Sequence, residues 1–170
     1  MLKKICLLSI AAVVLMGTAV PAESAVLRVA GTAFRPLSSG TGFGSNRPAI
    51  WAVNGVDYFE TPLYLPQGAV VTGLRMYYWD GSTTYDCVGM LTCYDIANFS
   101  SIFVGRSFSS GNPGFGYSDS AAFSHTIDYT NYAYSLTWYP SVAGSNQMWL
   151  IGFQITYTPP PGRAAVIPLN

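Results

Sequence analysis

Apolar and polar residues alternate with a period of two along most of this chain, and no segment keeps the helical period of 3.6 residues. In QMWLIGFQITY the odd positions from 149 onward are all large and apolar: Trp149, Ile151, Phe153, Ile155 and Tyr157. Side chains of a β-strand point alternately to its two faces. This segment is therefore predicted to be a strand with one apolar inner face.

Two further segments show the same alternation. In YAYSLTWY, residues 132–139, large residues alternate with small, hydroxyl or tyrosine side chains. In residues 70–79 the outer face would carry Arg75, Tyr77 and Trp79. The inner face predicted for that strand consists of Val70, Thr72, Leu74, Met76 and Tyr78.

Segments rich in Gly, Pro, Ser, Asn and Asp separate these strands and predict turns and loops. WDGSTTY is the clearest predicted hairpin, because Asp-Gly tolerates the positive φ angles of a tight turn. Residues 38–46 and 107–120 are predicted to be long loops, the second carrying Phe115 and Tyr117. Further strands are predicted at Val26–Phe34, Ala49–Val53, Tyr58–Tyr64, Tyr85–Tyr94, Ile102–Phe108 and Ala122–Ile127. Short strands between turns predict an all-β fold, an antiparallel β-sandwich of jelly-roll type.

The first residues are typical of a secretory signal peptide. Lys3 and Lys4 precede the apolar run Ile5–Val20, and small residues allow cleavage after Ala22 or Ser24. A membrane anchor is the alternative, but the run is shorter than the ~20 residues of a spanning helix and no stop-transfer charges follow. We therefore expect residues 1–24 to be a signal peptide and the protein to be exported, to the periplasm or the extracellular space.

The mature chain is expected to be one β-sandwich domain, residues 25–158, with a Pro-rich apolar tail, residues 159–170. It would hold six arginines and no lysine against seven or eight carboxylates, and it keeps every aromatic residue of the sequence. So few charges, near balance, argue against nucleic acid as a partner. No membrane span is expected in the mature protein.

Cys87 and Cys93 are the cysteines that remain after cleavage. In one continuous strand they would lie about 20 Å apart, far beyond the roughly 4.4–6.8 Å between the Cα atoms of a disulfide. We expect unbridged, half-buried thiols, although a bulged loop between them would allow a disulfide. Two cysteines are also too few for a structural zinc site.

Four segments together resemble an uncharacterised group of small secreted bacterial β-sandwich proteins. They are VAGTAFRPLSS, YLPQGAVVTGLRMYYWDGS, HTIDYTNYAYSLTWYP and LIGFQITYTPP. The resemblance covers most of the mature chain and consists of strand and turn patterns. It implies the fold and no established activity.

No catalytic residue, cofactor or metal site is predicted. His125 is the only histidine, and the chain lacks the G-x-S-x-G element of many serine hydrolases. Acidic residues flank predicted turns, where aspartate accepts backbone hydrogen bonds. A hydrolase is therefore the third and least favoured interpretation. A calcium site built from Asp80, Asp86, Asp128 and Asn131 is the less favoured interpretation of those oxygens.

The outward residues Arg75, Tyr77 and Trp79, with Phe115 and Tyr117, are the candidate ligand- or partner-binding residues. The first functional hypothesis is a non-catalytic structural or interaction protein of a surface, matrix or appendage. It would form homo-oligomers through exposed apolar strands or the C-terminal arm. The alternative is a carbohydrate-binding module whose exposed aromatic side chains contact a glycan or a cell surface.

Overall fold

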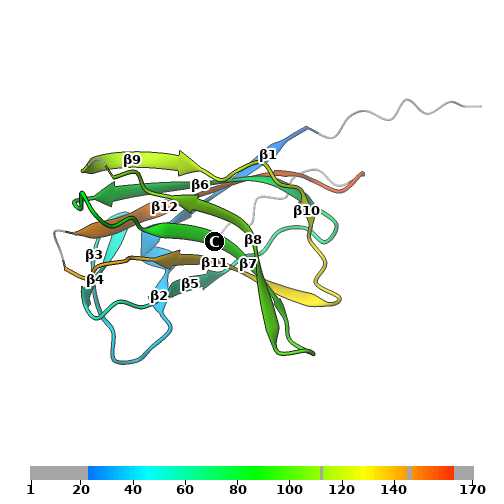
Figure 1. Ribbon diagram of the computed structural model, residues 1–170. Coiled ribbons are helices and arrows are strands. Elements are labelled where there is room, and N and C mark those ends of the chain that lie inside the picture. The colour runs from blue at the N-terminus through cyan, green and yellow to red at the C-terminus, as the bar shows by residue number, and fades with distance from the viewer. Residues whose placement is uncertain (1–22, 112, 145–146, 163–170) are drawn as a thin grey trace, which may run out of the picture.

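The protein, described by a computed structural model over residues 23–111, 113–144 and 147–162, consists of two antiparallel β-sheets packed face to face (Figure 1). The elements in chain order are β1 (Ala25–Ala30), the 3-10 turn η1 (Gly31–Ala33), β2 (Arg35–Pro36), β3 (Gly42–Asn46), β4 (Ala49–Asn54), β5 (Phe59–Pro62), β6 (Val70–Asp80), β7 (Val88–Asp95), β8 (Ser100–Phe108), β9 (Gly114–Asp119), β10 (His125–Thr126), β11 (Tyr132–Tyr139) and β12 (Met148–Thr158). The seven-stranded sheet has the order β10-β6-β12-β4-β3, and in it β1 also pairs with β12 and β9 with β6. The five-stranded sheet has the order β2-β5-β11-β7-β8. The predicted all-β, jelly-roll-like sandwich is confirmed.

The two sheets enclose one apolar core. The rings of Phe34 and Phe153 pack with centroids 5.5 Å apart, and those of Phe59 and Trp138 with centroids 5.3 Å apart. Each ring is almost completely removed from solvent, which is the main source of stability in such a sandwich. Over the described ranges, no helix is long and apolar enough to cross a bilayer.

The predicted Asp-Gly hairpin is wrong. β6 ends at Asp80 in the seven-stranded sheet, whereas β7 begins at Val88 in the five-stranded sheet, so the segment between them crosses the sandwich. Asp80 is buried, and its carboxylate accepts hydrogen bonds from the Ser82 amide at 2.8 Å and from the Ser109 hydroxyl. The aspartate thus fixes a crossover, because its buried oxygens need these donors.

The two predicted loops each contain a strand. Residues 114–119 form β9, which pairs along β6, and residues 42–46 form β3, which pairs with β4. Glycine alternates with the aromatic residues of β9, so the alternation is present but one of its faces carries only Gly114, Gly116 and Ser118. The absence of a side chain at Gly116 makes room for Tyr78, because a Cβ there would lie 3.0 Å from its ring.

A β-bulge in β12 makes half of its predicted inner face wrong. Leu150 pairs with Tyr78 and Gly152 pairs with Tyr77, which leaves Ile151 as an extra residue. Beyond the bulge Phe153, Ile155 and Tyr157 are buried as predicted. Before it the buried residues are Met148 and Leu150, so Trp149 lies on the outer face.

A second register shift in the same pair of strands changes the start of β6. Val71 is buried there, although the alternation predicts Val70 and Thr72 inside. From Leu74 to Trp79 the predicted inner and outer faces are confirmed. The remaining predicted strands are present with shifted ends, and two are much shorter: one ends at Ala30 before η1, and one is reduced to His125–Thr126.

Cys87 and Cys93 are free thiols as expected, but they are fully buried and not half-buried. The predicted termini lie mostly outside the described residues. Residues 1–22 of the signal peptide and residues 163–170 of the tail are not described, and Glu23 and Ser24 are exposed.

Candidate functional site

Four aromatic side chains lie in register across the outer face of the seven-stranded sheet. Trp51 of β4, Trp149 of β12, Trp79 of β6 and Phe115 of β9 occupy successive strands at one level. Neighbouring ring centroids are 5.3, 5.1 and 6.5 Å apart, which is the spacing of favourable aromatic pairs. We call these four residues the aromatic row.

Local backbone features hold the aromatic row in place. The bulge at Ile151 turns Trp149 outward, beside Trp79. At the other end, Gly44 of β3 lies beneath Trp51, because a Cβ there would be 2.4 Å from the indole ring. The row therefore depends on one bulge and one glycine as well as on four aromatic residues.

A second level lies two residues further along β6, where the rings of Tyr77 and Tyr117 have centroids 6.1 Å apart. Phe115 and Tyr117, both on the edge strand β9, are 72% and 59% exposed. A set of exposed aromatic side chains of this extent on one face is typical of an interaction surface.

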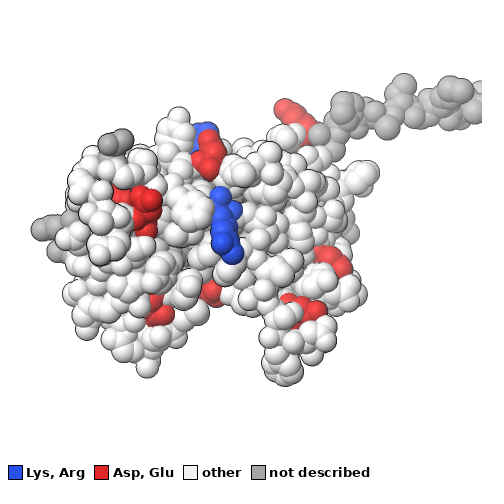
Figure 2. All heavy atoms as spheres, viewed as in Figure 1, with Lys and Arg blue, Asp and Glu red and all other residues white. Residues whose placement is uncertain are grey.

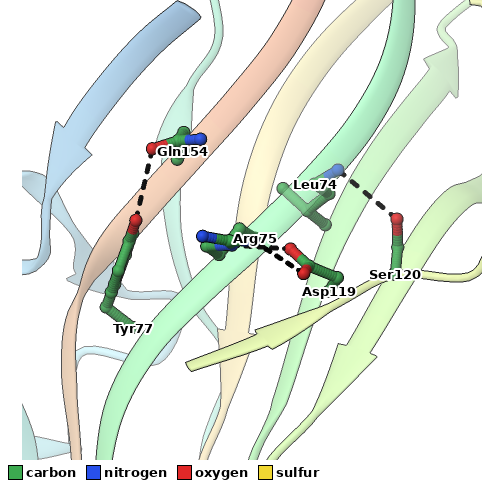
Figure 3. A network of polar contacts seen from close by, with 6 residues as sticks. All are labelled: Leu74, Arg75, Tyr77, Asp119, Ser120 and Gln154. Atoms are coloured by element: carbon green, nitrogen blue, oxygen red, sulfur yellow. Dashed lines mark hydrogen bonds and ion pairs between the residues drawn. The ribbon is translucent and has the colours of Figure 1, made fainter. Parts of the chain in front are cut away.

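The third level is polar (Figure 3). Arg75 donates two hydrogen bonds to Asp119, Nε to Oδ1 at 2.7 Å and Nη2 to Oδ2 at 2.8 Å. Its guanidinium also lies 4.3 Å from the ring centroid of Tyr117. Tyr77 donates its hydroxyl to Gln154 Oε1 at 3.2 Å. We call Arg75, Asp119 and Gln154 the polar row.

The ion pair of the polar row fixes both charges. The hydrogen bonds from Arg75 hold the pKa of Asp119 below its usual range, and Asp119 in turn raises the pKa of Arg75. A shallow polar hollow of about 240 Å³ adjoins this pair, where hydroxyl, amide and charged groups meet. The residues that line it are Thr72, Gly73, Leu74, Arg75, Asp119, Ser120, Gln154 and Thr156.

The structure brings all five candidate residues from the sequence, Arg75, Tyr77, Trp79, Phe115 and Tyr117, onto this one face. Their binding role remains a prediction. Four residues of the two rows are not among the five candidates: Trp51, Trp149, Asp119 and Gln154. Trp149 was hidden by the bulge, and Gln154 by its place in a strand that the alternation describes only through its apolar residues.

His125 is partly buried and contacts the other sheet. Its Nε2 lies 3.0 Å from the hydroxyl of Tyr134, and burial lowers its pKa. Burial also raises the pKa of the Cys87 thiol to about 11 and raises that of Cys93, so both favour the unreactive protonated form.

The aspartates at turns accept hydrogen bonds from backbone amides and a side-chain amide. Asp128 accepts from the Thr130 amide at 3.0 Å and from Asn131 Nδ2 at 2.7 Å. Asp57 accepts from the Ser38 amide at 2.6 Å. Across the described part of the chain, no group of three or more His, Cys, Asp or Glu side chains could hold a metal ion.

No family model and no curated protein matches this chain. Solved structures with a similar arrangement include an isomaltodextranase from Arthrobacter globiformis complexed with panose, at 17% identity and a TM-score of 0.46. The match covers 76% of this chain but only 23% of that enzyme.

Two isolated modules are similar over almost their whole length. The C-terminal CBM6 of LamC, a marine laminarinase from Zobellia galactanivorans, has 10% identity and a TM-score of 0.47, with 78% of this chain and 99% of the module covered. The carbohydrate-binding module CBM36, in complex with calcium and xylotriose, has 10% identity and a TM-score of 0.43, with 76% and 98% covered. The calcium and the sugars are ligands of those proteins.

Proposed function

We propose that this protein is a non-catalytic glycan-binding protein, and that the aromatic row and the polar row together hold a polysaccharide chain. The observation that carries this proposal is the continuity of the two rows on one sheet face. Four aromatic side chains in register lead within a few residues to Arg75, Asp119 and Gln154.

The chemistry of a sugar chain fits such a surface. One face of a pyranose ring consists of C–H groups and packs against aromatic side chains, while its rim of hydroxyls needs donors and acceptors. Phe115 and Tyr117 leave ring surface available, and the hollow beside Arg75 offers both kinds of hydrogen-bonding group. An apolar protein partner would leave that polar hollow unsatisfied, which carries a cost.

The small number of charges limits long-range electrostatic attraction. Figure 2 shows one side of the molecule with isolated acidic and basic groups separated by wide uncharged areas. Binding would then depend on stacking and hydrogen bonds more than on long-range attraction.

Retention of the purified protein on a panel of insoluble and gel-embedded polysaccharides tests the proposal. Trp79→Ala should weaken retention at least about tenfold while the circular dichroism spectrum stays native, because the row loses its central ring. Tyr58→Ala is the matched control, since Tyr58 stacks on Tyr139 with centroids 4.8 Å apart, away from the aromatic row. Absence of retention on every polysaccharide, or equal loss in both variants, would refute glycan binding on this face.

Self-association is the second candidate, and a separate surface favours it. The hairpin between β7 and β8 projects from the body of the sandwich (Figure 1), and β8 is an edge strand. Phe99 at its tip is 97% exposed, with Ile96 and Ile102 exposed nearby. Light scattering over a concentration series, with Phe99→Ser beside the wild type, tests this second role. An oligomer lost in the variant supports it, and a monomer at all concentrations excludes it.

A further inference from the structure

A hollow of about 280 Å³ separates the aromatic row from Gln154 on the outer face of the seven-stranded sheet. Tyr77 and Ile151 line it beside the aromatic row, and Arg28 of β1 lines it on the side of the polar row. Its floor is formed where Gly152 and Ala30 pair across β12 and β1. A sugar ring placed here would lie against Tyr77.

Small residues keep this hollow open. A Cβ on Gly152 would lie 2.5 Å from the carbonyl oxygen of Val29, so only glycine allows β1 to pair this closely with β12. Ala30 at the paired position adds only a methyl group. The sheet therefore has a gap in its outer side chains at the level where Tyr77 and Tyr117 lie on the neighbouring strands.

The level of the polar row has more positive than negative charges. Arg28, Gln154, Arg75 and Asp119 occupy successive strands in register, which gives this level one net positive charge. Asp119 neutralises Arg75 through two hydrogen bonds. Arg28 is exposed and forms no ion pair with any residue in 23–111, 113–144 or 147–162. Because Tyr77 occupies the oxygen of the Gln154 amide, the amide nitrogen next to Arg28 is also available as a donor.

We infer that the glycan bound on this face carries an anionic group, a carboxylate or a sulfate, held by Arg28 when its sugar ring occupies the hollow beside Tyr77. This inference rests on the proposed function and names the ligand class of the same site. A guanidinium presents a planar set of N–H donors that suits a two-oxygen anionic group. Arg75 is less suited to this part, because Asp119 balances its charge and takes two of its five N–H donors.

Paired polymers that differ only in charge test the inference. Affinity electrophoresis would compare polygalacturonate with its fully methyl-esterified form, and a sulfated galactan with agarose, each at about 0.05 M and about 0.5 M NaCl. The proteins are the wild type, Arg28→Gln and the control Arg106→Gln. Arg106 lies on β8 in the other sheet, with its guanidinium 4.3 Å from the ring centroid of Phe103. Neither exchange removes a buried side chain, and circular dichroism verifies the fold.

The expected result is at least about tenfold tighter binding to one anionic polymer than to its neutral counterpart, with the difference reduced in high salt. Arg28→Gln should remove this preference and leave binding to the neutral polymer unchanged, whereas Arg106→Gln should change neither. Whether the carboxylated or the sulfated pair shows the preference identifies the anion.

Other results overturn the inference in distinguishable ways. Equal binding to charged and neutral polymers by the wild type would reject Arg28 as an anion contact while glycan binding stands. An equal loss in Arg106→Gln would show unspecific attraction and also reject it. No binding to any of the polymers would reject the inference, and failure on the wider polysaccharide panel would reject glycan binding itself.

Discussion

The two outer faces of the sandwich differ in the side chains that they carry and in how far those side chains are exposed. On the seven-stranded sheet the outward residues include aromatic side chains that stack on one another in a half-exposed row. On the five-stranded sheet the central outward residues of β11 are Ser135 and Thr137, and both are buried. The face with polar residues is therefore the more completely covered of the two at its centre.

Hydrogen bonds explain the burial on the five-stranded sheet. Glu60 Oε1 accepts from the Tyr94 hydroxyl at 2.5 Å and from Thr137 Oγ1 at 3.0 Å, and the hydroxyls of Thr137 and Thr92 lie 2.9 Å apart. The long side chains of Glu60 and Tyr94 satisfy the hydrogen-bonding groups of the short polar side chains beside them, so this network stabilises the fold. The aromatic face stacks without covering itself, which leaves it available for a ligand.

Deleting the extra residue of a β-bulge should destabilise the two sheets by very different amounts, and this is the largest effect that we expect. Deletion of Ile151 from the central strand β12 would turn Trp149 into the core and Leu150 outward, because a one-residue slip reverses every side chain. We expect a loss of at least about 4 kcal/mol in the free energy of unfolding. Deletion of Val104, the extra residue of the edge strand β8, should cost about 1–2 kcal/mol, since β8 pairs on one side only.

Urea unfolding followed by tryptophan fluorescence measures both deletions. The near-ultraviolet circular dichroism of the stacked indoles should be lost without Ile151 and kept without Val104. Equal stability of the two deletion variants would show that the bulge in β12 is not what separates its inner and outer faces.

A matched pair of Tyr→Phe substitutions should separate a structural hydroxyl from a ligand-facing one. The Tyr94 hydroxyl donates to a carboxylate at 2.5 Å, and burial raises the pKa of Tyr94, so it stays a donor. Tyr94→Phe should cost about 1.5 kcal/mol of unfolding free energy without changing glycan retention. Tyr77→Phe loses a bond of 3.2 Å to a neutral amide and should cost less than about 1 kcal/mol, but it should weaken retention.

Thermal unfolding and polysaccharide retention of both Tyr→Phe variants show which hydroxyl stabilises the fold and which contributes to binding. The reverse assignment, with Tyr94→Phe weakening retention more than Tyr77→Phe does, would move the binding face to the five-stranded sheet.

Gly44→Ala should disturb the aromatic row with little effect on the core. The added Cβ would lie 2.4 Å from the Trp51 indole, so that ring must shift away from Trp149. We expect retention to fall a few-fold, with a loss of less than about 1 kcal/mol in stability. Gly40→Ala is the control, because no atom lies within 4 Å of its added Cβ. Unchanged retention in Gly44→Ala would show that Trp51 contributes nothing to binding.

The alternation of residues predicted which side chains of β6 face outward, but it did not predict how exposed they are. Arg75, Tyr77 and Trp79 point outward as expected, because period two follows from strand geometry alone. The burial of Thr137 depends on Glu60, which is distant in sequence and adjacent only after the sheets form. Exposure is therefore a property of the assembled sheet.

The errors in the predicted site have two physical causes. The bulge at Ile151 adds a residue without a sequence signal that period two can detect, so Trp149 was assigned to the core. In β9 the glycines leave space for Tyr78, but a glycine-rich sequence is also typical of a loop. The sequence therefore predicts Phe115 and Tyr117 in a loop, whereas both lie on a strand. The five candidate residues nevertheless lie on one face, and four of them are aromatic side chains that are recognisable in the sequence of a strand or a loop.

The two sheets also meet at a contact that contains a titratable histidine. A small pH dependence of Tm, the smallest effect that we expect, should arise from this contact. His125 of β10 and Tyr134 of β11 are joined across the sandwich at 3.0 Å, and the Tyr134 hydroxyl already accepts from the Asp128 amide at 3.1 Å. Burial lowers the pKa of His125 and raises that of Tyr134 to about 12, so the contact joins a neutral imidazole to a neutral hydroxyl. Because the folded pKa of His125 lies below the unfolded value of about 6.5, the unfolded chain binds the proton more readily.

Stability from this contact is therefore complete above about pH 6.5 and decreases as the pH falls from there through the lowered folded pKa. Thermal unfolding between about pH 7.5 and 5 should show a decrease of less than about 2 °C in Tm, because the imidazole is partly solvated. His125→Gln should flatten the curve over this range. The aspartates with lowered pKa values, such as Asp119, lose their contribution only below about pH 4, which separates the two effects. A wild-type Tm that rises on acidification to pH 5 would mean that the protonated imidazole is the form that joins the two sheets.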